Sequence, residues 1–103
     1  MSGPAKTHWV VLFEDTPAMT KIRDEKFAEH LQYLRSHPNL FEDGSALSVD
    51  EGAPPEGGIW IVQAASRDEV LEFVLSDPMF YPEHRRFRIL ATGKRLSIPR
   101  TKQ

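Results

Sequence analysis

The 103-residue chain contains no cysteine, which excludes disulfide bonds, thiolate zinc sites and cysteine nucleophiles. It has no apolar run near the ~20 residues that a membrane-spanning helix requires. No charge of one sign dominates, because the formal net charge is only -2, so nucleic acid is not expected as a partner. The 40% hydrophobic and 27% charged residues are typical of a single globular domain, here residues 1–103.

The two ends of the chain depart from this average composition. Residues 1–6 include Gly3 and Pro4 and lack the apolar core of a secretory signal, so we expect a loose terminus and a cytoplasmic protein. Residues 97–103 belong to a basic, weakly patterned stretch that begins at Gly93, and we expect them to be loose as well.

Six segments between these ends have the patterns of strands and helices. Strands are expected where β-branched and aromatic residues gather, and a proline disfavours helix in the residue before it. A turn is expected at Asp43–Gly44, and a loop at Asp50–Gly58. The predicted order is strand, helix, strand, strand, helix, strand. The four strands are His8–Phe13, Ser45–Val49, Ile59–Ala65 and about Arg85 to Ala91. The first helix runs from about Ala18 or Lys21 to Ser36, and the second, Ser66–Ser76, begins with a capping box formed by Ser66 and Glu69.

This order predicts the ferredoxin-like βαββαβ fold of the α+β class. Right-handed crossovers place both helices on one face of a four-stranded antiparallel sheet, with the first and third strands in the middle. These are the two strands that are apolar on both faces. The uncovered face would expose an apolar patch, so we expect a homodimer that packs sheet against sheet. The alternative is that a C-terminal arm around Ser97–Arg100 covers this face.

His30 is the first candidate for chemistry. It lies at the edge of an apolar stripe that Phe27, Leu31 and Leu34 form on the first predicted helix. A polar group costs free energy at such a position unless it has a partner, and we expect the partner to be Asp77. A carboxylate at the end of the second helix faces the negative end of the helix dipole. Taken alone, His30 could instead bond a backbone carbonyl, and Asp77 could start a local turn.

A His–Asp pair suits general acid–base chemistry. Asp77 would fix the tautomer of His30 and stabilise its protonated form, so that His30 acts as the base or acid. His84 is the second-choice partner for Asp77. His37 is seven residues from His30, about 10 Å along a helix, which is too far for one metal to bridge. No metal site is therefore expected, and no cofactor fingerprint is present in the sequence.

Three further residues are candidates for binding a substrate. The guanidinium of Arg23 suits a carboxylate or phenolate, although Arg23 could instead be a solvated helix residue that pairs with a nearby acid such as Glu14 or Glu25. Phe80 and Tyr81 could form the wall of a small aromatic pocket, although such residues more often belong to the core.

The fourth predicted strand carries three arginines, which together with Phe87 suggest a nucleic-acid strip. The alternation better fits a strand with a solvated or salt-bridged face, in agreement with the net charge. The three residues are Arg85, Arg86 and Arg88.

Short runs across most of the chain carry a resemblance to a known family. They are Glu29–Leu34, Asp43–Ser45, Ala65–Ser66 and Asp77–Phe80. With these runs the chain resembles the YciI-like (YCII-related) family of the dimeric α/β-barrel superfamily. It departs from the family where Gly44-Ser45 replaces the usual Gly-Pro, and in the basic tail after Leu96.

The resemblance implies a ferredoxin-like subunit that dimerises through its sheet, and an active-site pair at His30 and Asp77. It also draws attention to Ser45, which we expect among the substrate-binding residues. Some relatives carry out dehydrochlorination or related steps in the breakdown of hydroxylated aromatics, without a cofactor.

We therefore predict a cofactor-independent lyase or isomerase acting on a small, aromatic-derived acid. His30 would move a proton, Asp77 would orient His30, and Arg23 would hold an anionic group. The alternative is a non-catalytic dimeric protein that binds a small molecule in the same pocket. A purely structural module would have no ligand and would tolerate the loss of Asp77.

Overall fold

The computed structural model describes residues 6–93 and contains the six predicted elements in the predicted order. The elements are β1 (Thr7–Asp15), α1 (Met19–Arg35), β2 (Phe41–Leu47), β3 (Gly57–Ala64), α2 (Arg67–Leu75) and β4 (Arg85–Ala91). All strand pairs are antiparallel, in the order β2-β3-β1-β4. The predicted ferredoxin-like fold with β1 and β3 in the middle is confirmed. The expected loose ends, apart from Lys6, lie outside the described residues.

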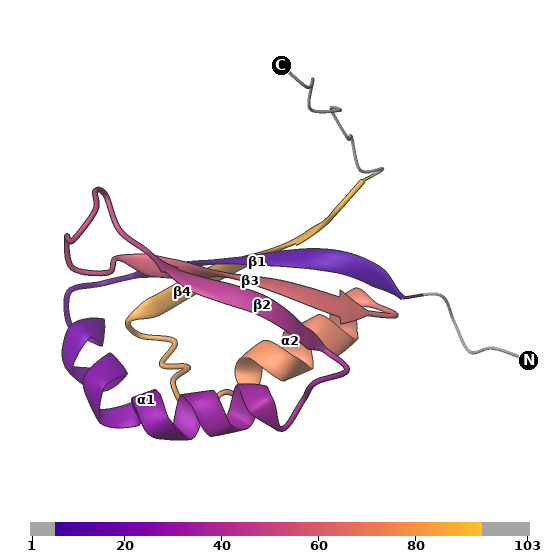
Figure 1. The fold of residues 1–103 in the computed structure, drawn as a ribbon, viewed down its shortest axis with the longest axis horizontal. Coiled ribbons are helices and arrows are strands. Elements are labelled where there is room, and N and C mark those ends of the chain that lie inside the picture. Colours follow the sequence, from indigo (N-terminus) through magenta and orange to yellow (C-terminus); the bar gives the residue numbers. More distant parts are fainter. Residues whose placement is uncertain (1–5, 94–103) are drawn as a thin grey trace, which may run out of the picture.

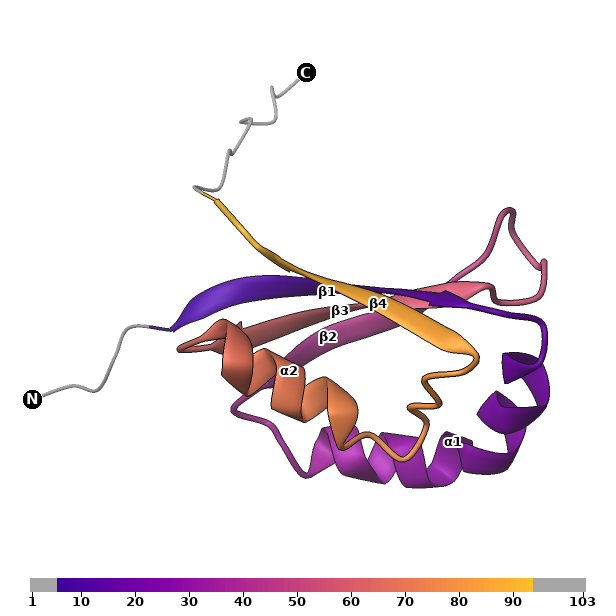
Figure 2. The same cartoon turned by 180° about the vertical axis from the view of Figure 1, so that it is seen from behind.

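Both helices cover the same face of the sheet (Figure 1), and the view from behind shows the same two layers (Figure 2). None of the described elements covers the opposite face. Half-buried Val10, Leu12, Ile59 and Ile61 alternate there with the buried residues of the central strands. This face carries the apolar patch expected from the sequence. The homodimer that would cover it stays a prediction.

The core lies between the sheet and the helices. α2 begins with the predicted capping box: Glu69 donates its backbone N–H to the Ser66 hydroxyl over 3.2 Å, and the Glu69 carboxylate accepts the Ala65 N–H over 2.9 Å. The cap fixes the residue at which α2 begins. The buried core residues are Val11, Phe13, Leu34, Trp60, Val62, Ala64, Val70, Phe73, Val74 and Ile89.

The predicted bounds of the second strand were wrong. β2 covers Phe41–Leu47, so the Asp43–Gly44 pair predicted as a turn lies within it, next to an irregularity in the strand pairing. Gly44 permits this because a Cβ there would lie 2.9 Å from the ring of Phe41. Val49, expected in the strand, follows it and is 79% exposed. No helix among the described residues is long and apolar enough to cross a membrane.

Candidate functional site

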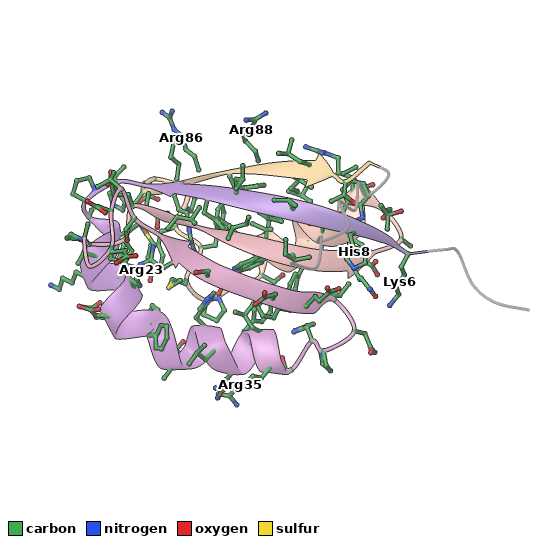
Figure 3. All side chains as sticks on the ribbon, turned by 45° about the horizontal axis from the view of Figure 1, so that its top comes forward. Lys6, His8, Arg23, Arg35, Arg86 and Arg88 are labelled. Atoms are coloured by element: carbon green, nitrogen blue, oxygen red, sulfur yellow. The ribbon has the colours of Figure 1, made fainter. Side chains whose placement is uncertain are left out.

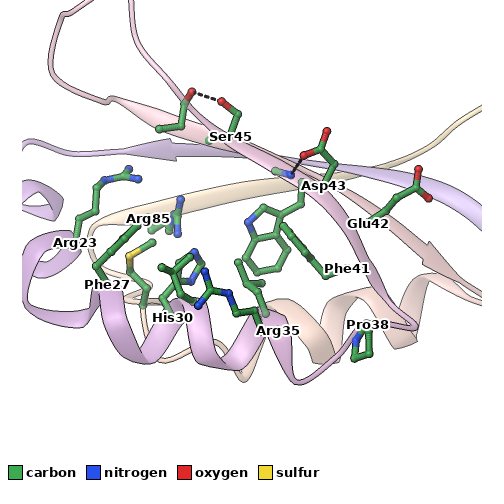
Figure 4. A pocket seen from close by; sticks show the side chains of 17 residues that line it. Arg23, Phe27, His30, Arg35, Pro38, Phe41, Glu42, Asp43, Ser45 and Arg85 are labelled. Carbon is green, nitrogen blue, oxygen red and sulfur yellow. Dashed lines mark hydrogen bonds between the residues drawn. The ribbon is translucent and has the colours of Figure 1, made fainter.

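A cavity of about 680 Å³ separates α1 from the sheet. It forms because α1 buries only Met19, His30 and Leu34 along its 17 residues, so most of this helix does not pack into the core. The apolar wall opposite α1 includes Trp60 and Phe41. Figure 4 shows the side chains that line the cavity. An apolar hollow with a few inward polar groups is the usual form of a small-molecule site.

His30 and Asp77 meet at this cavity. His30 Nδ1 lies 2.8 Å from Asp77 Oδ1 and 2.9 Å from Oδ2, and the two residues are only 7% and 5% exposed. The carboxylate accepts the Nδ1 proton, which leaves Nε2 as the basic nitrogen of a neutral imidazole. Asp77 Oδ1 also accepts the N–H of Met79 over 3.0 Å, so the local turn forms as well.

The basic nitrogen of His30 is free within the described residues. No hydrogen bond to its Nε2 is formed there, and the His30 side chain lines the cavity. The ring stacks on Trp60 with 6.1 Å between centroids, and Trp60 is 4% exposed. The imidazole is therefore fixed from one side by Asp77 and supported by an aromatic wall.

Arg23 also lines the cavity, but its acidic partner differs from those considered. Its Nη2 donates to Asp15 Oδ2 and to the carbonyl of Gly57 over 3.4 Å. Glu25 pairs instead with Lys21 at 3.8 Å. Pairing with a nearby acid is thus confirmed, but the acid is Asp15 and not Glu14 or Glu25, and Arg23 is not solvated, because its side chain is 16% exposed.

Arg85 is a cavity residue that the sequence interpretation missed. It is 3% exposed, its Nε lies 2.9 Å from Asp15 Oδ1, and its guanidinium carbon lies 4.0 Å from the centre of the Phe13 ring. Burial lowers the pKa of the Arg85 guanidinium from its ordinary value, and the Asp15 carboxylate opposes that shift. Of the three arginines on β4, Arg85 alone is buried, while Arg86 and Arg88 point away from the helices (Figure 3).

Strand periodicity contained the signal for both missed residues. Arg85 lies two residues before Phe87, on the face of β4 that also carries Ile89. Asp15 likewise follows Phe13 by two residues on β1. Charged residues that continue an apolar strand face indicate a buried ion pair.

Of the three other predicted substrate-binding residues, Ser45 lines the cavity and the two aromatic residues do not. Neither Phe80 nor Tyr81 is part of the lining, and Phe80 packs on Phe87 with ring centroids 5.5 Å apart. Ser45 lies on β2 at the edge of the cavity, and its hydroxyl donates to the Ala46 carbonyl over 3.0 Å (Figure 4). Phe80 and Tyr81 are therefore poorly placed to touch a ligand at His30.

Two other residues depart from the expectations. Phe27 lines the cavity but is 51% exposed, so it is not part of a buried stripe with Leu34. The His84 ring contacts the Thr16 hydroxyl at 3.2 Å. His30, not His84, is the partner of Asp77.

Comparisons with known proteins agree with this fold. The family model of the YCII-related domain matches residues 7–90. No curated protein matches the chain. A solved structure of 5-chloro-2-hydroxyhydroquinone dehydrochlorinase (TftG) from Burkholderia phenoliruptrix AC1100, in complex with 2,5-dihydroxybenzoquinone, is similar with a TM-score of 0.69 and 24% identity, over 87% of this chain and 93% of that one.

A second similar structure is SnoaB, a cofactor-independent oxygenase from Streptomyces nogalater. Its TM-score is 0.48 and its identity 16%, over 93% of this chain and 99% of that one. At these identities the likeness concerns the fold alone.

Proposed function

The chain belongs to the YCII-related family, and we propose that its cavity is the active site of a cofactor-independent lyase or isomerase for a small, aromatic-derived acid. The observation that carries this proposal is the buried His30–Asp77 pair, with Nδ1 and Oδ1 2.8 Å apart and the imidazole lining the cavity. A histidine oriented in this way is equipped to transfer protons.

In this mechanism Nε2 of His30 removes a proton from the substrate. The electron pair of the broken bond then either expels a leaving group, as in a lyase, or moves within the molecule, as in an isomerase. Asp77 stabilises the imidazolium formed at His30, because the carboxylate accepts its Nδ1 proton. In an isomerase, His30 returns the proton to a different atom of the substrate.

The name of the similar TftG structure supports an elimination of this type. A dehydrochlorinase removes a proton and a chloride, which requires a base but no redox group. The apolar walls around His30, such as Trp60, would keep water from the reacting atoms. Arg23 has both of its described hydrogen bonds on Nη2, so its remaining nitrogens would be available to an anionic substrate at the cavity.

The proposal is tested by replacing the base. Small phenolic acids, lactones and chlorinated hydroquinones are screened by thermal shift, and the compounds that stabilise the protein are assayed for turnover. We expect His30→Asn to lower kcat by about 10²-fold or more while leaving the fold intact. His37→Asn is the matched control, because His37 contacts the Tyr33 carbonyl at 2.8 Å and lies outside the cavity lining. Unchanged turnover in His30→Asn would disprove the mechanism.

A non-catalytic binding protein is the second candidate. It is favoured by the second hydrogen bond of Asp77, to the N–H of Met79, because a pair tied into the backbone in this way also serves the fold. In that case ligands would stabilise the wild type without forming product, and His30→Asn would alter affinity alone.

We further propose that the open face of the sheet pairs with a second copy of the chain. Its apolar centre includes Ile61 on β3 and Leu12 on β1. Ile61→Asp should yield a monomer in size-exclusion chromatography with light scattering, because a charge would be buried between the sheets. Val49→Asp, at a position 79% exposed, is the control. A monomeric wild-type protein would disprove the dimer.

A further inference from the structure

We propose that Arg85 binds the anionic oxygen group of the ligand, a carboxylate or phenolate, inside the cavity. The proposal rests on the proposed function in one respect, because it assigns the charge of the molecule that His30 would act on. Arg85, which is more deeply buried than Arg23, thereby takes the main anion-binding role that the sequence assigned to Arg23.

The first argument is an unused donor. Arg85 Nη1 is buried and forms no hydrogen bond to any described residue. The Nε atom is 2.9 Å from Asp15 Oδ1 but is not aligned for a hydrogen bond, so the contact is an ion pair. Buried N–H groups without an acceptor are rare, because leaving them unpaired costs free energy. An anionic oxygen of a ligand at Nη2, on the Gly58 side of the guanidinium, would supply an acceptor to this under-paired group.

The second argument is access. Arg85 and His30 both point into the cavity (Figure 4). Gly58, another cavity residue, lies beside the guanidinium: a Cβ at this position would lie 3.4 Å from Arg85 Nη2. The absence of a side chain at Gly58 therefore leaves the approach to Nη2 open. A ligand could reach Arg85 and His30 at the same time.

The third argument is charge. Among the described residues, the carboxylate of Asp15 contacts both Arg23 Nη2 and Arg85 Nε. These three side chains together have one positive charge in excess, and the negative charge of Asp77, which contacts His30, also acts on Arg85. The side chain of Arg85 is 2% exposed and that of Arg23 16%, so water screens Arg85 less. The ring of Phe13, 4.0 Å from the guanidinium carbon, holds the group in place.

The test compares benzoate with benzamide, which have nearly the same shape but differ in charge. Binding to the full chain is measured by calorimetry. We expect the wild type to bind benzoate about tenfold or more tightly than benzamide, the effect of a hydrogen bond to a charged group. Arg85→Met should remove this preference. Arg86→Met, one residue away with its side chain on the open face, should keep it.

Every outcome of this experiment bears on the proposal. Equal binding of the two compounds by the wild type, no binding of either, or a preserved preference in Arg85→Met would overturn it. If Arg85→Met does not fold, Arg85→Lys decides: lysine keeps the charge beside Asp15 but lacks the planar fork, so the preference should shrink. An unchanged preference in Arg85→Lys would overturn the proposal.

The comparison of benzoate with benzamide does not depend on whether the protein turns over a substrate. Benzoate has no leaving group, so its binding reports on Arg85 even if His30 performs no chemistry. Conversely, if the wild type shows no preference for benzoate but still turns over a substrate, Arg85 is removed from the site and the role of His30 stands.

Discussion

The two helices cover the same face of one sheet but contribute differently. α2 has nine residues and buries Val70, Phe73 and Val74 in the core. α1 has 17 residues and buries three, one of which is His30. The short apolar helix therefore holds the fold together, and the long polar helix forms a wall of the cavity. A site arises here because one helix packs and the other does not.

α1 nevertheless has to be held in place, and polar contacts to α2 contribute to this. Tyr33 donates its hydroxyl to the Phe73 carbonyl over 2.6 Å, which satisfies a carbonyl in the last turn of α2. His30 contacts Asp77, just beyond the end of α2. The same pair that is proposed for chemistry thus also fastens α1, so activity and helix position are linked.

The largest effect on turnover is expected where His30 contacts Asp77, in the variant Asp77→Asn. The amide oxygen can still accept the Met79 N–H, so the turn should survive. The variant loses the negative charge that stabilises imidazolium at His30, and kcat should fall by about 10²–10⁴-fold. Turnover is measured across pH, with Glu72→Gln on the exposed part of α2 as control. Activity equal to that of the wild type would show that Asp77 serves the fold only.

A matched pair of phenylalanines tests the division between core and cavity. Phe73 on α2 is 2% exposed, so Phe73→Ala should lower the free energy of unfolding by about 3–5 kcal/mol. Phe27 on α1 is 51% exposed, so Phe27→Ala should cost less than about 1 kcal/mol. Urea denaturation measures both. Equal losses would mean that α1 packs as tightly as α2 and that the two helices do not differ in their contribution to the core.

The same contrast explains what the sequence could reveal. The fold followed from the order of patterned segments. The position of α2 was predicted accurately, because its apolar stripe and its capping box indicate the same helix. Phe27 was misassigned because helical spacing does not tell whether a face meets the sheet or a cavity. The second strand was misplaced because β2 has exposed residues from Glu42 to Leu47 and no clear alternation.

The site was only partly predictable for a related reason. His30 and Asp77 stood out as polar groups at unfavourable positions on helices. The strand period places Arg85 and Asp15 on apolar strand faces, but it does not show that they meet, because their pairing depends on which strands become neighbours. β1 pairs with β4 and sets Asp15 opposite Arg85, a register that no local pattern specifies.

The start of each helix provides a smaller test. Ser66 has the extended backbone of an N-cap and accepts the Glu69 N–H, so Ser66→Ala should cost about 0.5–2 kcal/mol of stability. Ala18, before α1, already has helical angles (φ -62, ψ -22), so Ala18→Ser should gain almost nothing. Thermal and urea unfolding measure both variants. A clear gain from Ala18→Ser would show that the start of α1 has room for a cap.

The last effect concerns the Tyr33 link between the helices, and its dependence on pH appears only in alkaline solution. Burial raises the pKa of Tyr33 from 10.0 to about 12, and the charge of Asp77 acts in the same direction. The folded protein therefore retains the phenol proton after the unfolded chain begins to lose it. The stability from this link is complete below pH 10 and is lost as the pH rises through about 12.

Unfolding in urea, measured below pH 10 and again between pH 10 and about 12, tests this link against Tyr33→Phe. The variant should be less stable by about 0.5–1.5 kcal/mol at neutral pH, because it lacks the hydrogen bond to the Phe73 carbonyl. Its stability should decline less steeply than that of the wild type above pH 10, because it has no phenol at this position to ionise. Parallel declines would show that the Tyr33 hydroxyl titrates alike in both states. The fastening of α1 to α2 would then rest on His30 and Asp77, and Asp77→Asn would be expected to loosen the helix as well as slow the reaction.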